Sequence, residues 1–274
     1  MVPAPTDPSR EMRYDANLSI LFTELPLLDR PAAARAAGFD AVEMWWPFPV
    51  PEPPDREIDA LLRRIADAGV RLVGLNFDAG DMGAGERGLA SLTGGSARFR
   101  ANIDVAVGIA EATGCRVLNA LYGNRDPGVD PRAQDELAVA NVTLAAEAAR
   151  RCGATVVVEP LNSVDNPDYP LTSSTAALAF ADRVGAGNVA LLADLYHLAV
   201  MGEDPVDVIE RHADRFGHVQ IADAPGRGQP GTGTIPYAKV LAALDRSGYT
   251  GRVGLEYRPV GPSADSFGWI EEMP

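Results

Sequence analysis

The sequence predicts a single (β/α)8 TIM barrel, in which eight parallel strands close into a sheet that helices surround. The chain has 274 residues, close to the roughly 250 that such a barrel needs. Short apolar segments alternate with segments of helical periodicity, a pattern typical of parallel strands joined by crossover helices. In the second half, four successive apolar segments each hold or precede an oxygen-bearing side chain, and this fold builds its sites at the carboxyl ends of its strands.

The first half of the chain contains four of the predicted strands and three of the predicted helices. Asp29 and Ser96 are expected helix caps, and Gly38, Gly69 and Gly114 are expected helix ends. A long Gly-rich loop, residues 77–95, follows the third strand, and loops of this length inside a compact domain are often functional. The predicted strands are residues 17–22, 41–44, 71–76 and 116–120, and the helices are residues 32–37, 57–68 and 96–113.

The second half repeats the pattern. Thr172 or Ser173 is expected to cap one helix, and Pro236 is expected as the first residue of another. The predicted strands are residues 154–158, 189–193, 217–222 and 252–255, and the helices are residues 131–151, 173–184, 205–213 and 236–246. Residues 1–15 are Pro-rich and predict a flexible leader, which leaves residues 16–274 as one catalytic barrel domain.

Composition limits the function classes. The net charge of −14 argues against a nucleic-acid partner, which requires a basic face. No apolar run approaches the roughly 20 residues of a membrane span, so we expect no membrane partner. Two cysteines, Cys115 and Cys152, do not make a disulfide framework, and a reducing cytoplasm is the simplest compartment. The sequence leaves the oligomeric state open, and an oligomer is possible.

Four polar side chains at the ends of successive strands predict a metal site. Glu159, Asp194, Gln220 and Glu256 lie 35, 26 and 36 residues apart (159 to 194 to 220 to 256), and each interval has room for one crossover unit. Three carboxylates and an amide oxygen suit Mg2+ or Mn2+ rather than Zn2+ or copper. The alternative is that each residue is an ordinary cap or salt-bridge partner, but four of them at matching strand ends favour the metal.

The segments around these residues resemble the hydroxypyruvate isomerase family of the xylose-isomerase-like barrels. They read VVVEPLN, ADLYH, GHVQIADAPGRGQPGTG and GLEYRP. The similarity continues in NLSILFTELP, AGFDAVEMWWPF and GDMGAGERGLA, and covers the chain from about Asn17 to Trp269. It implies that Glu159, Asp194, Gln220 and Glu256 are the metal ligands, without an organic cofactor. It also implies that the two glutamates exchange protons with the substrate. Related sugar epimerases carry His at the position of Gln220.

Other residues are candidates for substrate contacts. His197, three residues after Asp194, is expected to hydrogen-bond a substrate oxygen, as the equivalent His does in the related epimerases; a structural histidine at a helix start is the alternative. Arg227 in the Gly-rich loop is expected to clamp a substrate carboxylate with its two-pronged guanidinium, or else to form a loop salt bridge.

Glu86, with Arg87, is expected in a lid over the site, and a plain charge pair is the alternative. Trp45 or Trp46 is expected to line the pocket.

These observations predict an isomerase that interconverts a small hydroxy-keto acid and its aldehyde isomer, with hydroxypyruvate and tartronate semialdehyde as the pair. A carboxylate moves the proton next to the carbonyl, and the metal stabilises the enediolate. The closest alternative is isomerisation of 2-dehydrotetronate, followed by a ketose 3-epimerase. A non-catalytic sugar-acid binding protein would not need both glutamates. A nuclease of the same superfamily would need several metal-binding His and a basic face, and the chain has three His.

Overall fold

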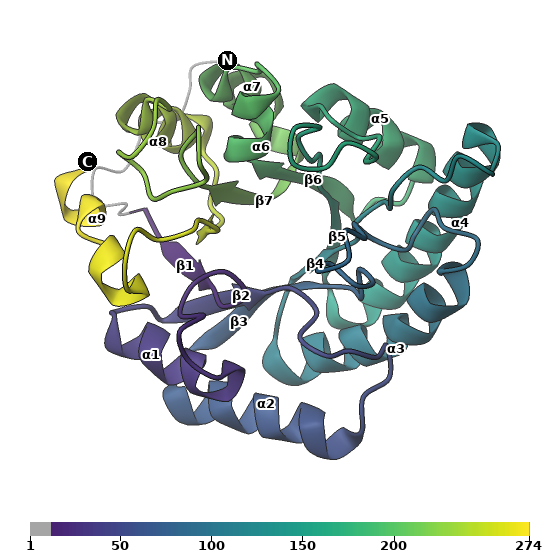
Figure 1. Ribbon diagram of the computed structural model, residues 1–274, viewed down its shortest axis with the longest axis horizontal. Coiled ribbons are helices and arrows are strands. Elements are labelled where there is room, and N and C mark those ends of the chain that lie inside the picture. Colours follow the sequence, from purple (N-terminus) through teal and green to yellow (C-terminus); the bar gives the residue numbers. More distant parts are fainter. Residues whose placement is uncertain (1–11, 274) are drawn as a thin grey trace.

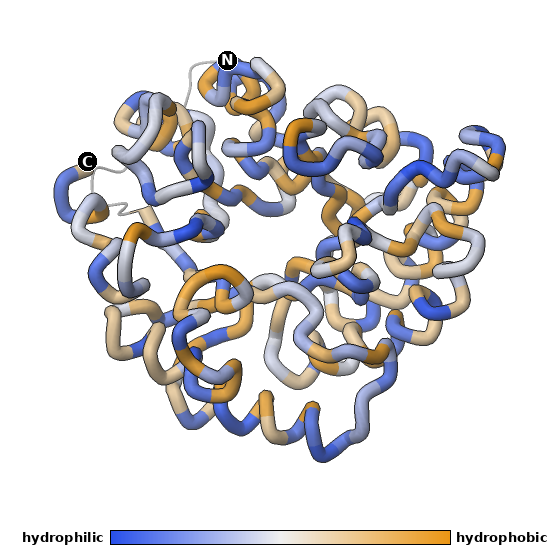
Figure 2. The backbone as a smooth tube through the Cα atoms, viewed as in Figure 1, coloured by the Kyte–Doolittle hydropathy of each residue, from blue (hydrophilic) through white to orange (hydrophobic). Residues whose placement is uncertain are grey.

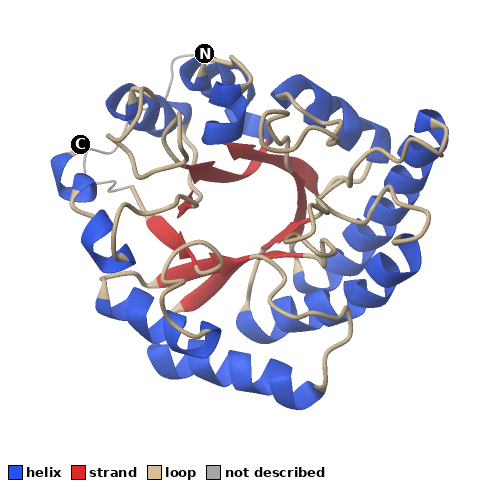
Figure 3. Ribbon diagram, viewed as in Figure 1, coloured by secondary structure: helices blue, strands red, loops and turns tan. Residues whose placement is uncertain are grey.

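The protein is a closed barrel of eight parallel strands in the order β1 to β8, as predicted (Figures 1 and 3). The structure is a computed structural model that describes residues 12–273. Each strand pairs in parallel with its neighbours, and β8 closes the sheet against β1. The strands are β1 Tyr14–Asn17, β2 Ala41–Met44, β3 Arg71–Asn76, β4 Val117–Asn119, β5 Thr155–Val158, β6 Val189–Asp194, β7 Phe216–Ile221 and β8 Val253–Leu255.

Helices form the outer ring (Figure 1). The α-helices are α1 Arg30–Ala36, α2 Asp55–Ala68, α3 Ser96–Thr113, α4 Pro131–Ala149, α5 Ser174–Val184, α6 Leu195–Val200, α7 Pro205–His212, α8 Tyr237–Ser247 and α9 Trp269–Glu272. Short 3-10 helices are η1 Leu27–Asp29, η2 Arg150–Cys152, η3 Ala213–Arg215 and η4 Ser263–Ser266. The short helix α6 directly after β6 was not predicted as a separate element. It matters because it carries His197.

The first strand lies three residues earlier than predicted. β1 is Tyr14–Asn17, and residues 18–22 form turns rather than a strand. The strand was not predicted at this position because Asp15 and Asn17 are polar and interrupt the apolar pattern. Both are nevertheless buried in the barrel interior. Residues 1–11 of the expected leader lie outside the described residues, and Tyr14 and Asp15, also assigned to it, belong to the barrel.

Helix starts were predicted less well than helix ends. Ser173 caps α5 as expected, with its hydroxyl accepting from the backbone N–H of Ala176 at 3.1 Å. The prediction that Ser96 caps α3 was wrong. Ser96 is the first residue of the helix, and its Oγ accepts a hydrogen bond from the Asn141 side chain. Asp29 precedes α1 without a capping hydrogen bond. Pro236 precedes α8 rather than opening it.

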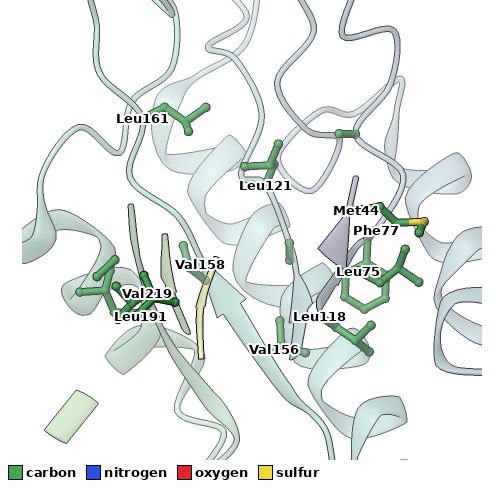
Figure 4. Close-up of a cluster of buried hydrophobic side chains, with 14 of the residues drawn as sticks. Met44, Leu75, Phe77, Leu118, Leu121, Val156, Val158, Leu161, Leu191 and Val219 are labelled. Atoms are coloured by element: carbon green, nitrogen blue, oxygen red, sulfur yellow. The ribbon is translucent and has the colours of Figure 1, made fainter. Parts of the chain in front are cut away.

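The hydrophobic core lies between the strands and the inner faces of the helices. Figure 4 shows Leu118, Val156, Leu191 and Val219 deep among the strands. Along the outer helices, hydrophobic and hydrophilic residues alternate (Figure 2), as expected of helices that bury one face. No helix within residues 12–273 is long and apolar enough to cross a bilayer. Both cysteines are buried and unpaired.

Candidate active site

A cavity of about 680 Å3 opens at the carboxyl ends of the strands, the end at which this fold places its sites. Glu159, His197 and Glu256 are among its lining residues. The loop leucines Leu121 and Leu161 also line it, and Figure 4 shows them apart from the deeper core leucines. The wall and mouth add Trp45, Arg87, Arg227 and Arg258. A negatively charged protein thus has a cavity with carboxylates inside it and three arginines around it.

The barrel brings the predicted ligands toward one point. Asp194 ends β6 and stands in register with Gln220 on β7, while Glu159 and Glu256 directly follow β5 and β8. Ligand atoms of Glu159, Asp194 and His197 lie within 4.8 Å of one another. Nη2 of Arg227 is 3.3 Å from Asp194 Oδ2 and 2.7 Å from Glu256 Oε2. We call Glu159, Asp194 and Glu256, with Arg227, the cavity cluster.

One buried oxygen in this region fits a hard cation. Gln220 is 4% exposed and donates from Nε2 to Glu43 Oε1 at 2.6 Å. Its Oε1 is buried and has no hydrogen-bond partner among the described residues. Buried polar atoms without a partner are rare, and Gln220 is in register with Asp194 on the neighbouring strand. An amide oxygen together with carboxylates is a donor set of the kind that Mg2+ and Mn2+ prefer. The residues therefore fit the predicted metal.

Burial and mutual repulsion make the cavity carboxylates difficult to ionise together. Burial raises the pKa of Glu159 well above its usual range, and the charges of Glu256 and Asp194 raise it further. Burial also raises the pKa of Glu256 to about 8, although Arg227 opposes this shift. The guanidinium of Arg227 lies 5.3 Å from the Tyr196 ring centre as well. A bound cation would lower these pKa values and favour the charged carboxylates.

His197 is placed as a hydrogen-bond donor. The backbone N–H of Asn162 donates to His197 Nδ1 at 3.0 Å, so in the neutral ring the proton must lie on Nε2. That nitrogen is 3.6 Å from Asp194 Oδ2, and the residue lines the cavity. Burial lowers the His197 pKa to about 4, which keeps the ring neutral. Nε2 can therefore donate to a substrate oxygen but is not free to ligate a metal.

The other predicted contacts differ in outcome. Arg227 reaches the cavity, but its guanidinium holds two cluster carboxylates. Glu86 is not brought to the cavity lining, because its carboxylate turns back to accept from the backbone N–H of Asp81 at 2.5 Å. Its neighbour Arg87 lines the cavity instead and donates to Asn166. Trp45 lines the cavity as expected and donates from Nε1 to Glu256 Oε1 at 2.5 Å.

Sequence reasoning missed a second group of polar residues, deeper in the barrel. Asp15, Glu43 and His218 are buried, and their possible ligand atoms lie within 4.8 Å of one another. We call these three residues the interior cluster. The available signal was the two-residue spacing of Asp15 with Asn17 and of His218 with Gln220, because such pairs share one face of a strand. Both pairs point inward.

Comparisons with known proteins agree with this geometry. Residues 31–273 match the family described as "Xylose isomerase-like TIM barrel". A Streptomyces coelicolor protein named "Putative hydroxypyruvate isomerase" is 57% identical, covering 95% of this chain and 96% of that protein. Escherichia coli "Hydroxypyruvate isomerase" is 34% identical, covering 95% and 98%. A Brucella melitensis protein named "AP endonuclease, family 2" has a crystal structure that is 37% identical with a TM-score of 0.87, covering 95% and 98%.

Proposed function

As a member of the hydroxypyruvate isomerase family within the xylose isomerase-like TIM barrels, this protein is an isomerase, and we propose that it uses Mg2+ or Mn2+ to interconvert a small hydroxy-keto acid and its aldehyde isomer. The observation that carries the proposal is the buried, unpartnered Oε1 of Gln220, a residue in register with Asp194 of the cavity cluster. Glu159, Asp194, Gln220 and Glu256 would hold the cation. Hydroxypyruvate and tartronate semialdehyde are the proposed pair, and the cytoplasm is the proposed compartment.

The chemistry requires a proton to leave a carbon next to a carbonyl and return to the neighbouring carbon, while the hydroxyl proton passes from one substrate oxygen to the other. When bound, the cation supplies positive charge to the two substrate oxygens on which negative charge develops. Glu159 and Glu256 both line the cavity, and we assign them removal and return of the proton. His197 Nε2 donates to a substrate oxygen. Trp45, Leu121 and Leu161 line the cavity and help to exclude water.

An acidic substrate fits the charge around the cavity. Arg87, Arg227 and Arg258 all line it, although the whole chain carries a net charge of −14. Guanidinium groups bind carboxylates in a two-pronged geometry, so we assign recognition of the substrate carboxylate to these arginines, with Arg227 as the principal candidate. Arg227 also forms ion pairs with Asp194 and Glu256, which place its guanidinium next to the proposed metal site.

A four-carbon acid is the second candidate. Pectobacterium atrosepticum "2-oxo-tetronate isomerase" is 33% identical, covering 94% of this chain and 97% of that protein. A cavity of about 680 Å3 has room for the additional CHOH unit. The net charge of −14 opposes action on a nucleic acid, despite the similarity to the Brucella melitensis protein. A ketose 3-epimerase remains the third possibility in the same superfamily.

The test is a substrate panel run on chelator-treated protein with and without added Mg2+ or Mn2+. We expect EDTA to abolish turnover and either cation to restore it, with hydroxypyruvate or the four-carbon 2-oxo acid as the best substrate. Product identification by NMR in D2O should find deuterium on a substrate carbon, because a carboxylate base exchanges its proton with water. Full activity in a preparation shown by elemental analysis to be metal-free would exclude the metal role.

A further inference from the structure

Glu43 lies beneath the predicted metal site, at a position that the proposed reaction does not use. We propose that Glu43 is a positioning residue, whose carboxylate fixes the Gln220 side-chain amide with its oxygen toward the cation. This inference rests on the metal site proposed above. It concerns how the ligand is oriented and adds no new contact to the substrate.

The barrel provides space for this carboxylate at two glycines. Glu43 is on β2 and is 3% exposed. A Cβ on Gly254 of β8 would lie 2.7 Å from Glu43 Oε1, closer than real Cβ atoms approach. A Cβ on Gly74 of β3 would lie 3.1 Å from Oε2. Glycine in a strand often marks such a close approach. The Glu43 carboxylate therefore lies in a compartment that larger residues in β3 and β8 would fill.

Both oxygens of Glu43 are occupied by donors. Oε1 accepts from Gln220 Nε2 at 2.6 Å and from Asn17 Nδ2 at 2.9 Å. Oε2 lies 2.6 Å from His218 Nε2. The His218 ring thus occupies Oε2 and leaves Oε1 to the side-chain amides of Gln220 and Asn17.

An acceptor at this place decides the orientation of the Gln220 amide. Glu43 Oε1 already accepts from Asn17 Nδ2 and acts as an acceptor at this place, so the NH2 end of Gln220 faces Glu43 and its Oε1 faces away. Exchange of the two ends would place two acceptors against each other in a buried environment, where such a contact is costly. Asn17 links Glu43 to a second predicted ligand, because the Asn17 Nδ2 that donates to Glu43 also lies 3.2 Å from Glu256 Oε1. Glu43 thus supports two of the four predicted ligands.

The interior cluster itself is better explained by this role than by a second cation. His218 Nε2, the nitrogen that would ligate an ion, is engaged with Glu43. Asp15 has two buried oxygens without a hydrogen-bond partner. Burial and the neighbouring charge of Glu43 raise its pKa to about 8, so a proton shared with Glu43 satisfies it. The cluster is consistent with an ion pair and a shared proton, which together leave the Glu43 carboxylate as an acceptor.

The inference is tested by a double-mutant cycle in which the Mn2+ affinity of each variant is measured. Calorimetry on chelator-treated protein gives the affinity without relying on turnover. Glu43→Gln permits either orientation of Gln220, and we expect Mn2+ to bind 10–100-fold more weakly, the usual cost of losing a partner of a ligand. Adding Gln220→Glu to this variant should recover at least tenfold, because the two oxygens of a carboxylate are equivalent and the amide introduced at position 43 can donate to one. The same Gln220→Glu change in the wild-type background should give no such gain.

Additive effects of the two substitutions would overturn the proposal. Glu203→Gln is the matched control: that carboxylate also accepts two hydrogen bonds, both from Ser174, and lies outside the cavity lining, so Mn2+ affinity should not change. Wild-type protein that binds no Mn2+ would instead contradict the proposed metal site. If Glu43→Gln does not fold, NMR of the wild type decides: the Gln220 side-chain amide protons, assigned by their absence in Gln220→Glu, should exchange slowly with water. Fast exchange would overturn the orientation argument.

Discussion

The barrel holds two buried groups of acidic side chains that look alike in composition and differ in what surrounds them. In the interior cluster, Glu43 is surrounded by donors on His218, Gln220 and Asn17. In the cavity cluster, three carboxylates share one guanidinium and face a cavity of about 680 Å3. Each cluster has a positive group beside its acids. Only the cavity cluster is open to a small molecule.

The difference shows that acidic residues alone do not identify a site. The interior cluster achieves near-neutrality within the protein, through an imidazolium and a protonated Asp15, and so serves as scaffold. The cavity cluster differs in access, because Glu159 and Glu256 line the cavity, although both accept hydrogen bonds, Glu159 from Asn119 Nδ2 at 2.7 Å. Carboxylates at an accessible place can bind a ligand, whereas a carboxylate enclosed by donors, such as Glu43, predicts rigidity.

The strongest contrast should appear when carboxylates of the cavity cluster lose their charge. Glu159→Gln and Glu256→Gln each keep an oxygen for the cation but remove the base, so we expect turnover to fall at least ~10²–10⁴-fold. Metal affinity should fall much less. Steady-state kinetics at saturating Mg2+, with Mn2+ calorimetry in parallel, measures both quantities. Turnover within a few-fold of wild type in either variant would remove that glutamate from proton transfer.

A smaller effect is expected at the cationic member of the cavity cluster. Arg227→Lys keeps the charge but loses the two-pronged contact. We expect kcat/KM to fall by a factor that corresponds to a loss of about 1.5–3 kcal/mol in transition-state stabilisation, the range for a hydrogen bond to a charged group. Comparison of an acidic substrate with its uncharged analogue separates the two roles of Arg227. A loss confined to the acid supports carboxylate recognition, and an equal loss for both supports only neutralisation of Asp194 and Glu256.

The sequence predicted the barrel because its alternation of apolar segments and helices is a local property. The predicted ligands were found for the same reason, since Glu159, Asp194 and Glu256 directly end or follow apolar runs. The interior cluster was missed because His218 is distant in sequence from its two partners and lies 175 residues after Glu43. Their contact exists only once the sheet closes, and spacing along a single strand does not show which face becomes the interior.

Loop residues were less predictable, and the reason lies in backbone conformation. Arg227 adopts a positive φ of 57°, and the loop is held by Asp223, whose carboxylate accepts from several backbone N–H groups, including those of Gly231 and Gly233. These contacts direct the guanidinium toward Asp194. In the 77–95 loop, predicted as a lid carrying Glu86 and Arg87, Glu86 accepts from the backbone of its own loop and Arg87 lines the cavity.

The smallest expected effect tests the scaffold side of the comparison and concerns stability. Asp15 has its pKa raised to about 8, first by burial and then by Glu43, so between about pH 4 and 8 the folded protein retains a proton that the unfolded chain releases. The free energy of unfolding therefore decreases as pH rises through this window. Asp15→Asn does not titrate and can still donate to Glu43. Relative to wild type, the variant should gain about 1–3 kcal/mol between pH 5 and pH 8, given ~1.4 kcal/mol per pKa unit.

Urea unfolding at both pH values, with Mg2+ saturating, measures this gain for Asp15→Asn. The exposed Asp40→Asn serves as the control, because the pKa of Asp40 is lowered and its charge is constant over this range. Parallel pH profiles for Asp15→Asn and wild type would mean that Asp15 is ionised in the folded protein. The interior cluster would then hold a net negative charge, and its contrast with the cavity cluster would lie in access alone.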